Sequence, residues 1–96
     1  GLAAEDLKEI LADVPSTRIP KSDLTGAGLS VTDLAVMSHL ARSKADAARL
    51  ADSGGVYINN IRVSNPRATV TLSDAIEGSV LLIRKGTKEY RLIELV

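Results

Sequence analysis

Basic side chains gather in two short clusters of the chain, where they could contact phosphate groups. Residues 42–67 carry five basic residues against two acids, and residues 84–91 carry four basic residues against one acid. Ser43 and Lys44 stand where a helix is predicted to begin, so backbone N–H groups, a hydroxyl and a cation there would face an incoming phosphate. Arg49 follows within two turns of the same predicted helix. These residues predict a phosphate-binding surface whose affinity would fall steeply with salt.

A tight hairpin is predicted directly after this helix. The runs 56–58 and 61–63 flank Asn59-Asn60, and Asn tolerates the positive φ that a two-residue type I′ turn demands. In that register Tyr57 pairs with Arg62 on the outer face. Such a pair can stack on a base or hold a phosphate, but in most hairpins it is only a solvent-face contact, so both interpretations stay open. The core-facing side of this hairpin is predicted to carry Val56, Ile58, Ile61 and Val63.

A second hairpin is predicted near the end of the sequence. Residues 79–96 form two β runs joined at Lys85-Gly86-Thr87-Lys88. Arg84, Lys85 and Lys88 make its tip basic, as a loop that meets phosphates would be. Lysines at hairpin tips also serve as ordinary solubilising residues, so the tip alone leaves both interpretations open.

Composition excludes several classes of function. The 96 residues allow one domain, and 45% hydrophobic with 25% charged residues is typical of a globular protein that folds. Without cysteine and with one histidine, His39, neither a metal site nor a catalytic centre is predicted, and no cofactor is expected. No apolar run is long enough to cross a membrane, and the acidic start is unlike a secretory leader. The start at Gly1 instead of methionine favours an excised domain.

The pattern of apolar residues predicts the elements that position these side chains. A helix is expected near residues 4–13, followed by a connecting loop over 15–29 that touches the core through Ile19 and Leu24. Ser30 and Ser43 are each followed three residues later by an aspartate, which predicts two helix starts; the first helix would run to about Ala41 and include His39. A short strand is expected at 70–72. We therefore divide the chain into an N-terminal helix and loop (1–29) and a compact domain (30–96).

Two runs of the sequence resemble known families. The run LARSKADAARLADSGGVYINNIRV is similar to a small RNA-binding module, the S-four domain, with its serine-plus-basic helix start, its glycine stop and its hairpin. The ending EGSVLLIRKGTKEYRLIEL resembles the C-terminal end of bacterial and organellar tyrosyl-tRNA synthetases. The resemblance implies an α+β fold in which two short helices pack on a small, mainly antiparallel sheet.

The resemblance also implies a function. Such a domain performs no aminoacylation itself but grips tyrosine tRNA around its long variable arm and anticodon stem, while ATP and tyrosine bind in the catalytic domain of the parent protein. The parent would be a homodimer of the bacterial cytoplasm, mitochondrion or chloroplast, and the isolated domain a monomer. The matching RNA-binding positions are Arg42, Ser43, Lys44 and Arg49 on the helix side, Asn59, Asn60 and Arg62 on the hairpin, and Arg84, Lys85 and Lys88 at the basic turn.

Two other interpretations stay open at this stage. The same fold could serve as the ribosomal-RNA module of a pseudouridine synthase or of a ribosome-associated heat-shock protein. The net charge of zero instead favours a protein-interaction module that binds no RNA.

Overall fold

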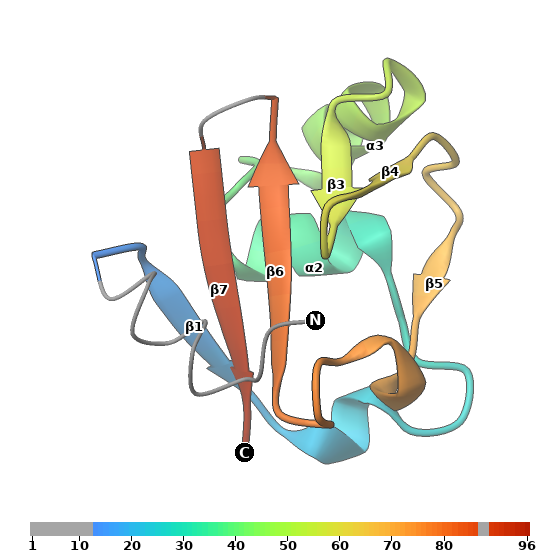
Figure 1. The fold of residues 1–96 in the computed structure, drawn as a ribbon. Coiled ribbons are helices and arrows are strands. Elements are labelled where there is room, and N and C mark those ends of the chain that lie inside the picture. Colours follow the sequence, from blue (N-terminus) through green and yellow to red (C-terminus); the bar gives the residue numbers. More distant parts are fainter. Residues whose placement is uncertain (1–12, 87–88) are drawn as a thin grey trace.

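A five-stranded sheet forms the centre of the computed structural model, which describes residues 13–86 and 89–96. Helices α2 (Val31–Met37) and α3 (Lys44–Asp52) both lie on one face of this sheet (Figure 1). The strands follow the spatial order β1 (Ser16–Ile19), β7 (Glu89–Leu95), β6 (Val80–Lys85), β3 (Val56–Ile58) and β4 (Ile61–Val63). All neighbours are antiparallel except β1 and β7. The α+β fold class expected from the sequence is confirmed.

Both helices begin at the predicted serines. The hydroxyl of Ser30 accepts a hydrogen bond from the backbone N–H of Asp33 at 3.1 Å, and the hydroxyl of Ser43 accepts one from Asp46 at 3.2 Å. Each serine has extended backbone and stands immediately before the first helical residue. These two N-caps satisfy amide groups that the helices themselves leave without partners.

The two helices end in the same way but with different residues. Gly54, with φ +77°, ends α3, and the N–H of Gly55 reaches back to the carbonyl of Leu50 at 2.9 Å. His39, with φ +63°, takes the equivalent place after α2, and the N–H of Leu40 reaches back to Ala35 at 2.8 Å. The prediction that His39 lies on a helix running to Ala41 is therefore wrong, because the chain has already turned into the left-handed region there.

The first hairpin forms in the predicted register, with Tyr57 opposite Arg62 and positive φ at both turn asparagines. The prediction that Ile61 faces the core is wrong, since 71% of this residue is exposed. The strand β4 lies at the sheet edge and splays away from β3 (Figure 1). Ile61 lies beside the hairpin turn at this edge, where it lines an open hollow with Val31 and Ile58 and is not covered by the core.

The segment predicted as a connecting loop contains regular structure. Residues 16–19 form β1, which pairs in parallel with residues 92–95 of β7, and a 3₁₀ turn, η1 (Lys21–Leu24), follows. The short strand β2 (Leu29–Ser30) then pairs with β5 (Thr69–Val70). The expected strand at 70–72 is shorter than predicted, because Leu72 begins a second 3₁₀ turn, η2 (Leu72–Asp74). The helix predicted near 4–13 falls almost wholly outside the described residues.

The core between the sheet and the helices is aliphatic. Ile19 and Leu24 are fully buried in it, as expected, so residues 16–24 share one core with the rest of the described chain. The other large side chains at its centre are Val31, Leu34, Val56, Leu81, Ile83 and Ile93. In the described part of the chain, no helix is long and apolar enough to cross a membrane, and no three metal-ligating side chains gather.

Candidate nucleic-acid interface

The fold places the predicted RNA-binding residues on two faces of the sheet. Arg42, Ser43, Lys44 and Arg49 lie at and just before α3, on the helix-covered face. The strand register places Tyr57, Arg62 and Arg84 together on the opposite face, since Tyr57 lies directly opposite both arginines. Lys88 lies outside the described residues.

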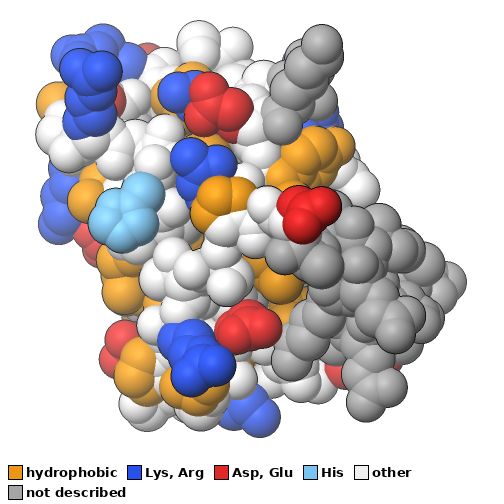
Figure 2. All heavy atoms as spheres, turned by 90° about the vertical axis from the view of Figure 1, so that its left-hand side faces the viewer, with side chains coloured by type: hydrophobic (Ala, Val, Ile, Leu, Met, Phe, Trp, Pro, Cys, Tyr) orange, Lys and Arg blue, Asp and Glu red, His pale blue; other side chains and the backbone are white. Residues whose placement is uncertain are grey.

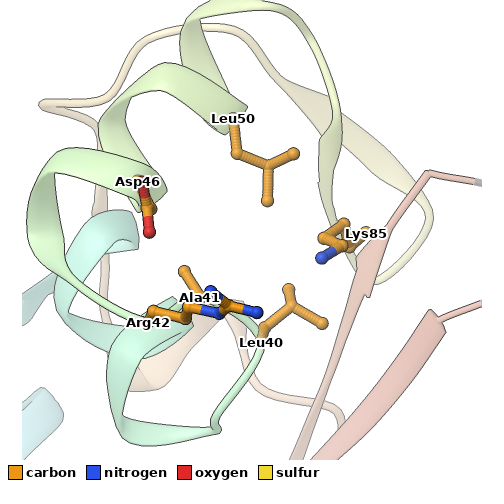
Figure 3. Close-up of a pocket in the computed structure, with 6 residues that line it drawn as sticks. All are labelled: Leu40, Ala41, Arg42, Asp46, Leu50 and Lys85. Atoms are coloured by element: carbon orange, nitrogen blue, oxygen red, sulfur yellow. The ribbon is translucent and has the colours of Figure 1, made fainter.

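A pocket beside α3 brings together cations from distant parts of the sequence. It has a volume of about 320 Å³ and is lined by Leu40, Ala41, Arg42, Asp46, Leu50 and Lys85. We call it the α3 pocket. In Figure 3 the side chains of Arg42 and Lys85 approach it from opposite walls, while the leucines supply apolar lining. An anionic group seated between these two cations would be attracted by both.

Carboxylates neutralise part of this charge. The ammonium of Lys44 lies 3.0 Å from a carboxylate oxygen of Asp33, Arg49 pairs with Asp46, and Lys85 lies 3.8 Å from Glu89. The Lys44 hydrogen bond is the main reason why the pKa of Asp33 lies below its ordinary value, with a smaller contribution from Ser30 and burial acting in the opposite direction.

Arg42 differs from these cations. Within the described residues it has no ion pair, and it is exposed. Its charge is therefore available to a ligand.

Basic and acidic side chains are interspersed over the described part of the face in Figure 2, so the surface is mixed in sign there. Local placement of single cations, and not a uniformly basic surface, has to provide any affinity for RNA.

Ser43 is already engaged in the fold. Its hydroxyl caps α3 by accepting the amide hydrogen of Asp46. That geometry fixes the start of the helix, and with it the positions from which Arg42 and Lys44 project.

On the outer face of the sheet, arginines surround Tyr57. The guanidinium of Arg62 donates to the Tyr57 hydroxyl at 2.8 and 3.2 Å. The guanidinium carbon of Arg84 lies 3.9 Å from the centroid of the Tyr57 ring, which is a cation–π contact. The same guanidinium carbon of Arg84 lies 5.8 Å from the centroid of the Tyr90 ring. Tyr90 was not among the predicted site residues; the register of the second hairpin, which sets it opposite Arg84, was the signal that could have identified it.

The two turn asparagines have different surroundings. The side chain of Asn59 points into the domain, where its oxygen accepts the N–H of Leu82 at 2.9 Å and its nitrogen donates to the carbonyl of Asp74 at 2.7 Å. Both polar atoms of the amide are thus used to hold the hairpin against β6 and η2. Asn60 is exposed at the turn and available to a ligand.

Comparison with known proteins identifies the family. The model of the tyrosine–tRNA ligase SYY-like C-terminal domain matches residues 6–93 of the chain. The chain belongs to this family. Family membership confirms the resemblance inferred from the sequence and favours it over the ribosomal-RNA modules considered as an alternative.

Individual relatives agree with this assignment. The chain is 43% identical over 96 residues to the tyrosine–tRNA ligase of Roseiflexus castenholzii, matching all of the chain and 23% of that protein. It is 42% identical over 89 residues to the tyrosine–tRNA ligase of Rhodopirellula baltica, matching 93% of the chain and 20% of that protein. The chain thus spans about a fifth of the length of these relatives.

A solved structure has the same fold. A solution structure of a tyrosyl-tRNA synthetase C-terminal domain superposes with a TM-score of 0.76 at 28% sequence identity. The match covers 99% of this chain and 91% of that one. The architecture of the C-terminal domain family is therefore present over the described chain.

Proposed function

We propose that this domain binds tyrosine tRNA for a tyrosine–tRNA ligase. It holds the long variable arm and the anticodon stem, so that the acceptor end reaches a catalytic domain of the same protein, where tyrosine and ATP bind. The names of the relatives support this assignment. In this proposal the domain supplies binding and orientation only, and the parent protein dimerises through residues outside this chain.

The observation that carries the proposal is the meeting of Arg42 and Lys85 at the α3 pocket. These residues are far apart in the sequence, and the fold directs both toward one hollow (Figure 3). RNA helices are recognised largely through their phosphates, 2′-hydroxyls and shape. The two cations therefore attract a phosphate of the tRNA backbone to this hollow, while the capped start of α3 supports the arginine.

The experiment is a binding titration of this chain with tyrosine tRNA, beside a tRNA that lacks the long variable arm, over a range of salt concentrations. We expect tighter binding to the long-armed tRNA. Lys85→Ala weakens binding several-fold and lowers the slope of log K against log salt by about 1, because one phosphate contact is lost. Lys21→Ala is the matched control, since it removes the same charge from an exposed position in η1.

Three results would contradict the proposal. Equal binding to both tRNAs would refute the assignment to the long arm. Equal weakening by Lys85→Ala and Lys21→Ala would show that only net charge matters and not the α3 pocket. Absence of binding to either tRNA at low salt would refute RNA recognition by this domain and favour a protein-binding role.

A further inference from the structure

Four side chains form a row across the sheet face that is turned away from the helices. Adjacent strands β4, β3, β6 and β7 contribute one residue each, and the register sets Arg62 opposite Tyr57, Tyr57 opposite Arg84, and Arg84 opposite Tyr90. We call this set the arginine–tyrosine row. Arginine and tyrosine alternate along it, and it contains both tyrosines of a chain that has no Phe and no Trp.

The two arginines of the row contact a tyrosine and a backbone carbonyl. Arg62 bonds to the Tyr57 hydroxyl, and Arg84 lies over the Tyr57 ring and donates to the carbonyl of Gly86 at 2.8 Å. Among the described residues, no acid lies within ion-pair distance of either arginine. This differs from the helix side, where Lys44 and Arg49 are both paired with aspartates.

Two features of the row point to a ligand. The Nε atom of Arg84 is buried and has no hydrogen-bond partner in the described part of the chain, although a buried donor normally has one. Tyr57 and Tyr90 are both partly exposed on this face, so a ligand can reach them. Their strands are separated by β6, so two strand spacings place the rings roughly 10 Å apart.

The chemistry of the row suits unpaired nucleotides. Aromatic rings and guanidinium planes stack on the faces of nucleobases, and arginine binds the adjoining phosphates. In a double-stranded stem the base faces are hidden by their neighbours, so only unstacked bases in loops, bulges or single strands can use such a surface. We propose that the arginine–tyrosine row binds unpaired nucleotides of the RNA, with a base stacked on Tyr90 and phosphate held by Arg62 and Arg84.

This proposal rests on the proposed RNA-binding function and adds which part of the RNA is held. The α3 pocket would take backbone phosphate on the helix-covered face, whereas the row would take unpaired bases on the other face. The two surfaces can be tested separately, because Lys85 and Arg42 belong to one and Tyr90 to the other.

Intrinsic tyrosine fluorescence reports directly on the row. The chain has two tyrosines and no tryptophan, so all of this emission comes from Tyr57 and Tyr90. We would titrate the chain with an unstructured eight-nucleotide oligouridylate and with a blunt RNA duplex at equal phosphate concentration. Free N-acetyl-tyrosinamide titrated in parallel corrects for absorption by the RNA. We expect saturable quenching by the oligouridylate and little quenching by the duplex.

A matched pair of variants separates stacking from folding. Tyr90→Phe keeps the ring, and the hydroxyl that it removes has no hydrogen bond to any of the described residues, whereas Tyr90→Leu removes the ring. Both variants lack one of the two tyrosine fluorophores. Their affinities are therefore measured by the fluorescence anisotropy of a labelled oligouridylate. We expect wild-type affinity for Tyr90→Phe and a loss of about 5- to 100-fold for Tyr90→Leu, the range found when a stacking aromatic is removed.

The outcomes distinguish this proposal from the proposed function. If tyrosine tRNA binds in a Lys85-dependent way but the oligouridylate causes no quenching, the row proposal is overturned while tRNA binding stands. Equal quenching by duplex and single strand would also overturn it, since base faces would not be required. Quenching and ring-dependent affinity for the oligouridylate, without any preference for the long-armed tRNA, would support the row and refute the proposed tRNA specificity.

Discussion

Replacement of Asn59 separates a role in positioning the hairpin from a role in contacting RNA. The resemblance to the S-four domain implies that Asn59 contacts RNA, yet both polar atoms of its side chain bond within the domain. The N–H of Leu82 depends on one of these bonds, and Leu82 is only 5% exposed. Asn59→Gly removes both bonds while it accepts the positive φ of 50° at this position.

The expected cost follows from the burial of the partners. A buried N–H left without an acceptor costs about 1–3 kcal/mol, whereas the exposed Asp74 carbonyl can be bonded by water instead. We therefore expect Asn59→Gly to lower the free energy of unfolding by about 2 kcal/mol, which corresponds to a fall in Tm of roughly 10 °C for a domain of this size. Asn59→Ala should cost about 1 kcal/mol more, because alanine is disfavoured in the left-handed region.

Urea unfolding followed by circular dichroism measures the stability, and tRNA titration at 15 °C, where both proteins are folded, measures the affinity. We expect Asn59→Gly to bind within about twofold of the wild type, because both polar atoms of the amide are already bonded within the domain. Asn60→Gly is the control at the exposed turn position. A wild-type unfolding midpoint for Asn59→Gly combined with a several-fold loss of tRNA affinity would refute the reasoning.

Two further predictions concern the helices. His39→Gly should stabilise the domain by about 1 kcal/mol in urea unfolding, because glycine occupies the left-handed position after α2 without strain; no gain over His39→Ala would contradict this. Asp33 has a folded-state pKa below its ordinary value of 3.8, so its pair with Lys44 contributes stability above that pH and loses it as the pH falls further. In Lys44→Ala the free energy of unfolding should therefore fall less steeply as the pH drops below 4. If it falls as steeply as in the wild type, the pair does not contribute this stability.

Local signals in the sequence were sufficient to predict the helix starts and the first turn. A serine hydroxyl needs only an amide three residues away to act as a cap, as at Ser30 and Ser43. The turn at Asn59-Asn60 likewise depends on the conformational range of two adjacent residues. Family resemblance then supplied the fold class, since the motifs extend over most of the chain.

Features that depend on distant partners were not predictable in the same way. Residues 16–19 alternate too briefly to identify a strand, and their partner β7 stands at the other end of the sequence. The exposure of Ile61 depends on its place beside the turn of an edge strand, which the alternation of residue types does not encode. The meeting of Arg42 and Lys85, and the alignment of Tyr90 with Arg84, required the strand order and register.

The parallel pairing of β1 with β7 sets when this domain can finish folding. Strand β7 lies inside the sheet, between β1 and β6, although it follows all the other described strands in the sequence. Until residues 89–95 have been synthesised, β1 cannot pair with β7, and Ile19 cannot pair with Leu95. Such long-range contacts slow folding, because the chain must close a large loop before they form. Completion of the sheet, which carries the arginine–tyrosine row on one face and the two helices on the other, therefore depends on these seven residues.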